Sequence, residues 1–305
     1  MSLLSAFIRA GDIDSVNFFI QRFPPFLLVS FPDVIKSIFS ILHAIIEPLY
    51  NKLNCRLIPK SDDIVFDFAC KSFEDCNPLV FKLLHLISYN IYEDSILFTK
   101  LIRLFSHFIK DPLCYSNSEF FCGVIMTINN VFLPALTQME SNCVASEEIW
   151  HLIRIFPYNL RYKFYSHMKN SAYVSIQQLV RTKSIVTKNT KYICKRITKD
   201  TLKQCGRQLG KLSHSNPIIV LTEVMNQICS FDTMIIPIVE CLKYLTPLSF
   251  DMLSYTLIEF LSVNSVSLTS KITSIPDVIQ NLGTFASTVM RKYVVPLTGV
   301  LQYIA

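Results

Sequence analysis

The chain has 305 residues, a formal net charge of +6 at pH 7 and an apolar content of 51%. Only 6 residues are glycine, whereas 14 are proline. Doubly wound sheets, barrels and P-loop folds depend on glycine-rich turns, so this scarcity argues against all three classes. Prolines that stand between apolar runs favour helices that start or stop there. The composition therefore predicts an all-α fold.

Cysteine and histidine carry no pattern typical of a metal site. The 10 cysteines include no CxxC pair, and the 6 histidines form no HxH or HExxH motif. We therefore predict no catalytic centre, no metal and no cofactor. The longest uncharged run, Phe120–Met139, has the length of a membrane span. It contains Asn129, Asn130 and Pro134, which lipid tolerates poorly, so we expect a buried helix and no membrane partner.

The first half of the chain is a succession of amphipathic patterns separated by prolines. Pro32 is expected to open a helix in which apolar residues recur at spacings of three and four, from Ile35 through Leu42 to Ile46. Similar patterns cover residues 79–87 and 96–108. Such segments, joined by short links, predict stacked antiparallel helical hairpins. Because no repeat of fixed period is present, the predicted arrangement is an irregular α-solenoid.

Aromatic and basic residues are interleaved in the next stretch. A helix is expected to begin at Ser146, and Pro157 is expected to restart the chain after it. Trp150, the only tryptophan, precedes a cluster of tyrosines and phenylalanines that surrounds Arg161 and Lys163. Such a cluster suits stacking on single-stranded RNA. The alternative is a helix with an aromatic core face and a solvated basic face.

Positive charge is concentrated between Arg161 and Lys211. This stretch holds thirteen of the 29 Lys and Arg residues but a single acid, Asp200, so the remainder of the chain is mildly acidic. A helical pattern places Leu179, Val186, Ile193 and Ile197 on one face and the cations on the other, which suits an RNA backbone or an acidic protein. The candidate binding residues are Arg161, Lys163, Arg181, Lys188, Lys191, Tyr192, Lys195, Arg196, Lys199, Lys203, Arg207 and Lys211.

The segment GRQLGKLSHSNP suggests two catalytic motifs, and both fail. Gly206 and Gly210 are separated by three residues where a P-loop has four, and no apolar strand precedes them. Ser213–Ser215 contains a histidine but lacks the third group that a nucleophile and base require. We expect a structural role instead. The glycines would relax the chain between helices, and Asn216 would cap the next helix with Pro217 in its first turn.

Several segments together resemble the THO complex subunit 2 family. They are SEEIWHLIRIFPYNLRYKFYSHMKN, KYICKRITKD, CGRQLGKLSHSNP, IVECLKYLTPLSFDMLSY, MRKYVVPLTGVLQYIA and, more weakly, EDSILFTKLIRLF. The resemblance runs from about residue 80 to the end and is densest over 146–262; before residue 80 it is only compositional. Met168 stands where the family usually has an aromatic residue.

The resemblance implies a non-catalytic α-helical scaffold in the nuclear THO/transcription–export complex, which acts in mRNP assembly, mRNA processing and mRNA export. It implies other THO complex subunits, a DEAD-box RNA helicase and mRNA as partners. Family members are several times longer, so the chain is expected to be a central fragment. Two alternatives from other classes are an independent single-stranded RNA-binding helical module and an importin-like transport solenoid. The latter requires regular two-helix repeats, which the sequence lacks.

Three parts are predicted along the chain. Residues 1–154 would form an N-terminal helical scaffold region, part of the family's N-terminal domain. Residues 155–231 would form a basic region that carries the family's signature. Residues 232–305 would continue the helical solenoid, truncated at its C-terminal end.

Overall fold

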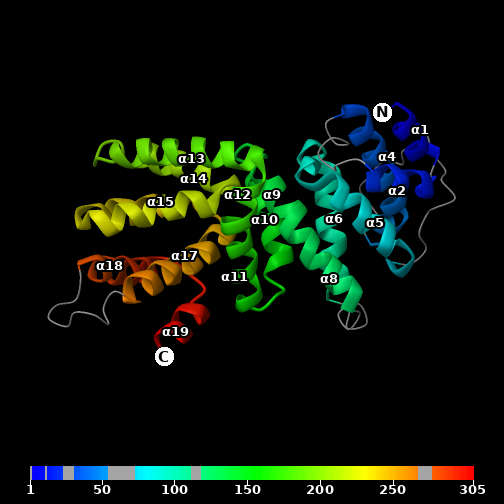
Figure 1. The fold of residues 1–305 in the computed structure, drawn as a ribbon. Coiled ribbons are helices and arrows are strands. Elements are labelled where there is room, and N and C mark those ends of the chain that lie inside the picture. The colour runs from blue at the N-terminus through cyan, green and yellow to red at the C-terminus, as the bar shows by residue number, and fades with distance from the viewer. Residues whose placement is uncertain (1, 11, 23–30, 54–72, 111–117, 267–276) are drawn as a thin grey trace. The chain divides into compact units, whose positions relative to one another are not determined.

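A computed structural model describes residues 2–10, 12–22, 31–53, 73–110, 118–266 and 277–305 (Figure 1). Within these ranges every regular element is a helix, which confirms the predicted all-α class. The chain divides into two compact units, Met1–Ala135 and Leu136–Ala305. The three-part division drawn from the sequence stays a prediction.

The first unit is built around α4. It contains α1 (Ser2–Ala10), α2 (Ile13–Arg22), α4 (Pro32–Leu53), α5 (Phe73–Ile87), η1 (Ser88–Glu93), α6 (Ser95–Phe108), α8 (Ser118–Thr127) and the π-turn η2 (Ile128–Phe132), and it ends within α9 (Leu133–Leu136). Helix α4 opens at Pro32 as predicted and packs against α1, α5 and α6. Its inward face, with Ile35, Leu42 and Ile46, is buried.

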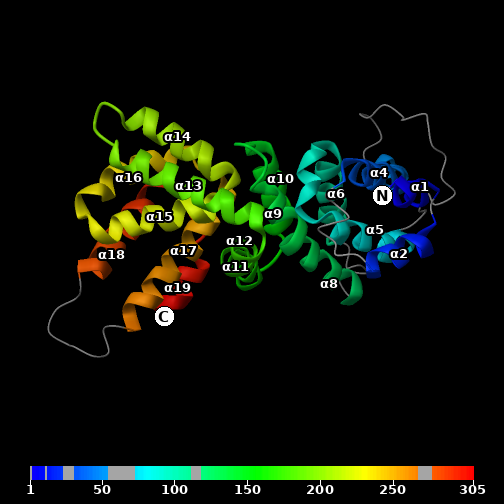
Figure 2. The same cartoon turned by 45° about the horizontal axis from the view of Figure 1, so that its top comes forward.

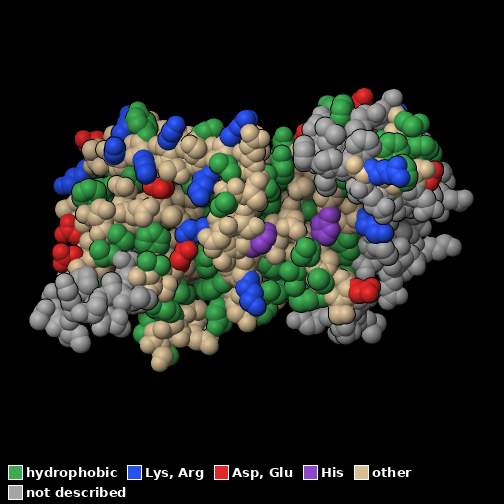
Figure 3. Space-filling model, viewed as in Figure 1, with side chains coloured by type: hydrophobic (Ala, Val, Ile, Leu, Met, Phe, Trp, Pro, Cys, Tyr) green, Lys and Arg blue, Asp and Glu red, His purple; other side chains and the backbone are tan. Residues whose placement is uncertain are grey.

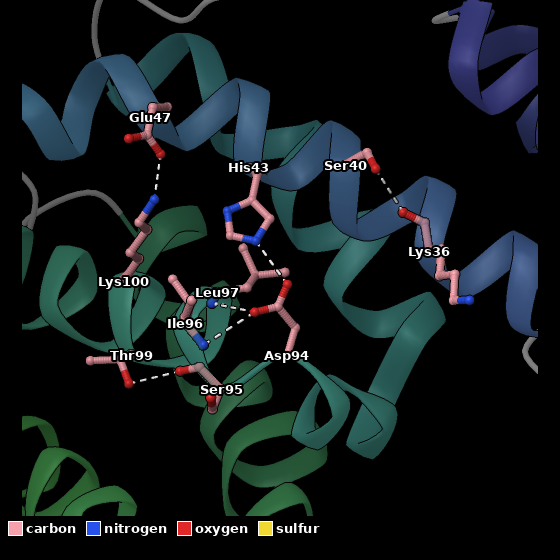
Figure 4. Close-up of polar contacts among 10 residues, drawn as sticks. All are labelled: Lys36, Ser40, His43, Glu47, Asp94, Ser95, Ile96, Leu97, Thr99 and Lys100. Carbon is pink, nitrogen blue, oxygen red and sulfur yellow. Dashed lines mark hydrogen bonds and ion pairs between the residues drawn. The ribbon is translucent and has the colours of Figure 1, made fainter. Parts of the chain in front are cut away.

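Two polar pairs join α4 to α6 (Figure 4). His43 Nε2 lies 2.8 Å from Asp94 Oδ2, and Lys100 Nζ donates to Glu47 Oε2 at 2.5 Å. Asp94 is the N-cap of α6, and its Oδ1 accepts the backbone N–H groups of Ile96 and Leu97. Asp94 therefore both starts α6 and links it to α4.

Hydrogen bonding also sets the charge state of Asp94. Partial burial would raise the pKa of its carboxyl. The hydrogen bond with His43, the backbone N–H groups of Leu97 and Ile96 and the charge of His43 outweigh burial, so the pKa lies below its ordinary value.

The long uncharged run forms α8, η2 and α9. Ser118–Leu136 is the one segment in the described part of the chain with the length and hydropathy of a membrane span. However, 56% of its most apolar stretch of 18 residues is buried inside the protein. Phe120, Val124 and Val131 are in the core, as predicted for a buried helix.

The second unit contains α10 (Cys143–Ile153), α11 (Tyr158–His167), η3 (Met168–Ala172), α12 (Tyr173–Ser175), α13 (Gln177–Lys195), α14 (Leu202–Ser215), α15 (Pro217–Ser230), η4 (Asp232–Met234), α16 (Ile235–Cys241), η5 (Leu242–Tyr244), α17 (Pro247–Val266), α18 (Asp277–Lys292) and α19 (Thr298–Ile304). Helix α15 is central, because it packs against α13, α14, α17 and α18. Figures 1 and 2 both place it between α13 and α17. This stacking is compatible with the predicted solenoid.

One helix start differs from the sequence prediction, and another agrees with it. Helix α10 begins at Cys143, because Asn142 caps it by accepting the N–H of Ala145, whereas the pattern suggested a start at Ser146. Ser146 is instead buried, with its hydroxyl 3.1 Å from that of Thr246. Pro157 does restart the chain, as the N-cap of α11.

Candidate partner-binding surface

Arg161, the first of the predicted binding residues, is engaged inside the second unit. Its Nε and Nη2 donate to the two carboxylate oxygens of Asp251 at 2.8 and 2.9 Å, and its Nη1 donates to the carbonyl of Phe156 at 2.8 Å. The Arg161 side chain is 12% exposed and Asp251 is fully buried. The hydroxyl of Tyr165 donates to the same carboxylate at 2.6 Å. This bidentate pair joins α11 to α17, so a partner would have to break it to reach Arg161.

The pKa directions agree with this network. Burial alone would lower the pKa of Arg161, but hydrogen bonds to Asp251 and its charge outweigh burial and raise it. Burial, the charge of Asp251 and the hydrogen bond to it raise the pKa of Tyr165 well above its ordinary value. Both groups therefore keep their protons at neutral pH.

The aromatic cluster around Arg161 is mainly a core. Phe156, Phe164 and Tyr165 are buried, and the rings of Phe156 and Phe164 meet edge to face with centroids 5.6 Å apart. Met168 is buried too. Lys163 is exposed on the other side of α11. The arrangement favours the aromatic core face with a solvated basic face over a stacking platform.

Helix α13 has the two faces that its sequence predicts. Leu179, Val186 and Ile193 are buried, and the helix packs against α15. Ile197, assigned to the same face, lies past the helix end at Lys195 and is half-buried. Because this apolar face is buried, the opposite face of α13 is exposed to solvent.

The outward cations of α13, of α14 and of the link between them form what we call the basic surface (Figure 3). Its members are all exposed: Arg181, Lys188, Lys191, Lys195, Arg196, Lys199, Lys203, Arg207 and Lys211. Helix α14 lies beside α13 and carries its three cations at steps of four residues, which places them on one face.

Few acids neutralise the basic surface. Lys191 Nζ lies 3.6 Å from Glu223 Oε2 on α15, and the Glu223 carboxylate is largely buried. Arg196 donates to the hydroxyl of Tyr192 at 2.9 Å, and its guanidinium carbon lies 5.1 Å from the centre of that ring. Among residues with a described position, no ion pair involves the other seven cations. Their charge is available to a partner.

Gly206 and Gly210 have a different role from the one expected. Both lie inside α14, not in a link between helices, and both are buried. A Cβ on Gly210 would be 2.6 Å from the Cβ of Tyr244, and one on Gly206 would be 3.0 Å from the Tyr244 ring. The glycines let α14 approach η5 closely, which holds the cations of α14 on the outer side. Asn216 does precede α15 as its N-cap, although its side chain makes no capping bond.

The thiols of Cys194 and Cys241 and the hydroxyl of Ser213 are buried in the second unit. In the described ranges, no three His, Cys, Asp or Glu side chains gather in a way that would hold a metal ion. Burial raises the pKa of Cys194 to about 12 and that of Cys241 to about 11, so both stay thiols at neutral pH. Ser213 is fully buried and donates to the carbonyl of Gly210 at 2.8 Å.

One surface residue was missed by the sequence analysis. Ile185 is 59% exposed and lies between Arg181 and Lys188 on the outer side of α13. Its position four residues after Arg181 and three before Lys188 is the signal that would have found it. Tyr192, which was predicted, is 61% exposed in the same row.

Two family models match the chain in succession. One, described as THO complex subunit 2 N-terminus, matches residues 68–207, and the other, described as Transcription- and export-related complex subunit, matches residues 209–283. THO complex subunit 2 of Homo sapiens is 34% identical over 320 residues, and that of Arabidopsis thaliana is 26% identical over 335 residues. Both alignments cover 100% of this chain, including the first 80 residues, where the sequence analysis found only a compositional likeness. The chain spans 20% of the human relative and 18% of the plant relative.

Proposed function

Because the chain belongs to the THO complex subunit 2 family, we propose that it acts as a non-catalytic scaffold within a THO complex. The observation that carries the proposal is the continuous similarity along the whole chain, across two consecutive family models. An all-helical build supports it, because stacked helices offer long surfaces to other subunits.

The proposed setting is the nucleus. The description of the second family model, a transcription- and export-related complex subunit, supports a role in mRNP assembly, mRNA processing and mRNA export. The proposed partners are the other THO complex subunits, a DEAD-box RNA helicase and mRNA, bound directly or through the complex. Within this role, the basic surface is the proposed contact for an acidic partner, since eight of its nine cations have no carboxylate at ion-pair distance among the described residues.

Co-purification tests the scaffold proposal. The chain is expressed with the other THO complex subunits, and we expect it to elute with them in size-exclusion chromatography. The informative variant is Lys203→Glu/Arg207→Glu/Lys211→Glu, which reverses the α14 part of the basic surface. The matched control, Lys36→Glu/Lys82→Glu/Arg291→Glu, changes the net charge equally at exposed positions elsewhere. A folded wild-type chain that never elutes with any THO subunit would contradict the proposal.

An independent single-stranded RNA-binding module is the second candidate function. The observation in its favour is the row of exposed cations, of which only Lys191 forms an ion pair with a described residue. If four of them contact phosphates, the logarithm of the affinity for poly(U) should fall with the logarithm of salt concentration with a slope of about −3. Measured RNA affinity that is weak at low salt would reject this candidate and leave the scaffold proposal intact.

A further inference from the structure

A straight row of exposed residues runs along the outer side of α13. We call it the α13 seam: Arg181, Ile185, Lys188, Tyr192 and Lys195. Successive members are four, three, four and three positions apart. Alternating steps of three and four repeat every 3.5 residues on average, which is the spacing that a helix uses to pack along a second helix. Its 14 positions from end to end correspond to about 21 Å of helix.

The seam alternates apolar and basic side chains. Ile185 and Tyr192 are 59% and 61% exposed, although each would be stabilised by leaving water. Between and beside them stand three cations, none of which forms an ion pair with a described residue. A complementary helix therefore needs apolar residues at two positions and carboxylates near the other three.

The same details argue against RNA as the occupant of the seam. Tyr192 is already engaged by its own chain, because Arg196 donates to its hydroxyl at 2.9 Å and the guanidinium carbon lies 5.1 Å from the ring centre. Ile185 has no planar face and no hydrogen-bonding group to offer a nucleotide. Sequence-tolerant RNA binding relies on stacked aromatic rings, whereas helix packing relies on apolar side chains at this spacing.

We infer that the α13 seam binds an acidic amphipathic helix of a partner protein. Apolar side chains of that helix cover Ile185 and Tyr192, and its carboxylates pair with Arg181, Lys188 and Lys195. The inference rests on the proposed scaffold function and specifies the kind of partner that this side of the second unit receives.

A synthetic peptide tests the inference. The probe is a labelled three-heptad helix with Leu opposite Ile185 and Tyr192 and Glu opposite the cations, and binding to the whole chain is followed by fluorescence anisotropy. Ile185→Ala/Tyr192→Ala should weaken binding about tenfold or more, because two central apolar contacts are lost at constant net charge. The matched control, Val174→Ala/Val180→Ala, truncates two exposed valines outside the seam and should leave the affinity unchanged.

Three results would overturn the inference. In the first, a scrambled peptide of the same composition binds equally well, so that only charge matters. In the second, the two alanine variants behave alike. In the third, poly(U) displaces the peptide and binds Ile185→Ala/Tyr192→Ala more weakly than it binds the wild type, which assigns the seam to RNA. A chain that elutes with THO subunits but fails these tests keeps the proposed function and loses only this inference.

Discussion

Two regions of the second unit contain cations from one basic stretch of sequence, and they differ in what surrounds those cations. Arg161 on α11 is held by both carboxylate oxygens of Asp251, which lies 90 positions later in the chain. Lys188 on α13 is exposed and makes no ion pair with a described residue. The difference shows that a charge count locates cations along a sequence but does not tell which of them the fold itself neutralises.

The two regions should also differ in what they contribute to folding. Removing one partner of a buried ion pair strongly lowers the free energy of unfolding, because the other charge is then left buried without compensation. Exposed cations contribute little to stability and much to association. Mutations can therefore test the comparison. The expected loss in the free energy of unfolding is largest for the Asp251 network and smallest for the outer side of α13.

The largest effect is expected for Asp251→Ala. It leaves the Arg161 guanidinium without its carboxylate and removes the acceptor of the buried Tyr165 hydroxyl. We expect a loss of about 3 to 5 kcal/mol in the free energy of unfolding, measured with urea. Arg161→Met/Asp251→Leu should cost less than Asp251→Ala, because it leaves no buried charge behind. A loss below about 1 kcal/mol would mean that the pair is not buried in solution.

A second, smaller effect should follow from Gly210→Ala. The added Cβ would lie 2.6 Å from the Cβ of Tyr244 and 3.0 Å from its carbonyl oxygen, so α14 must shift. We expect a loss of about 1 to 2 kcal/mol, since overpacking outweighs the gain in helix propensity. The matched control is Gly283→Ala in α18, where a Cβ would have no neighbour within 4 Å. That variant should gain about 0.5 to 1 kcal/mol. Equal effects of the two substitutions would refute the close approach of α14 to η5.

Asp94 and His43 in the first unit lie between the two extremes, because both are partly exposed. The pKa of Asp94 is lower in the folded state than in the unfolded chain. Its stabilising effect is therefore complete above the unfolded pKa of about 4 and is lost as the pH falls through the folded value. Asp94→Asn keeps a good N-cap but removes the charge, so it should reduce acid sensitivity by less than about 1 kcal/mol. Urea unfolding of both proteins between pH 2 and pH 6 gives the measurement. Identical pH profiles would show that the fold does not lower the pKa of this carboxylate.

Sequence periodicity was sufficient for features that depend on neighbours along one helix. The buried positions Leu179, Val186 and Ile193 follow from the helical repeat alone, as does the helix that opens at Pro32. Contacts between distant segments were out of reach. Nothing near Arg161 indicates that Asp251 will bind it, and no local pattern tells that Gly210 will lie against Tyr244.

The smallest effect on folding is expected for the outer side of α13. Arg181→Glu, Lys188→Glu, Lys195→Glu and Lys199→Glu should each change the free energy of unfolding by less than about 0.5 kcal/mol, because none of these residues makes an ion pair with a described residue. Urea unfolding measures each change, and binding of the acidic helical peptide should be lost in the combined variant.

Lys191→Glu, in the same basic region, is expected to cost more stability than these four charge reversals. Lys191 Nζ lies 3.6 Å from Glu223 Oε2, and the Glu223 carboxylate is only 12% exposed. A glutamate here would set two negative charges against each other, one of them poorly hydrated, so its cost should exceed that of the other four reversals. Because Lys191 itself is 53% exposed, solvent screening should keep the loss near about 1 kcal/mol. Restoring stability with Glu223→Gln in the Lys191→Glu background would identify this repulsion as the cause. If all five reversals cost the same, Lys191 contributes to the fold no more than the other four cations, in contrast to Arg161, which the buried Asp251 carboxylate holds.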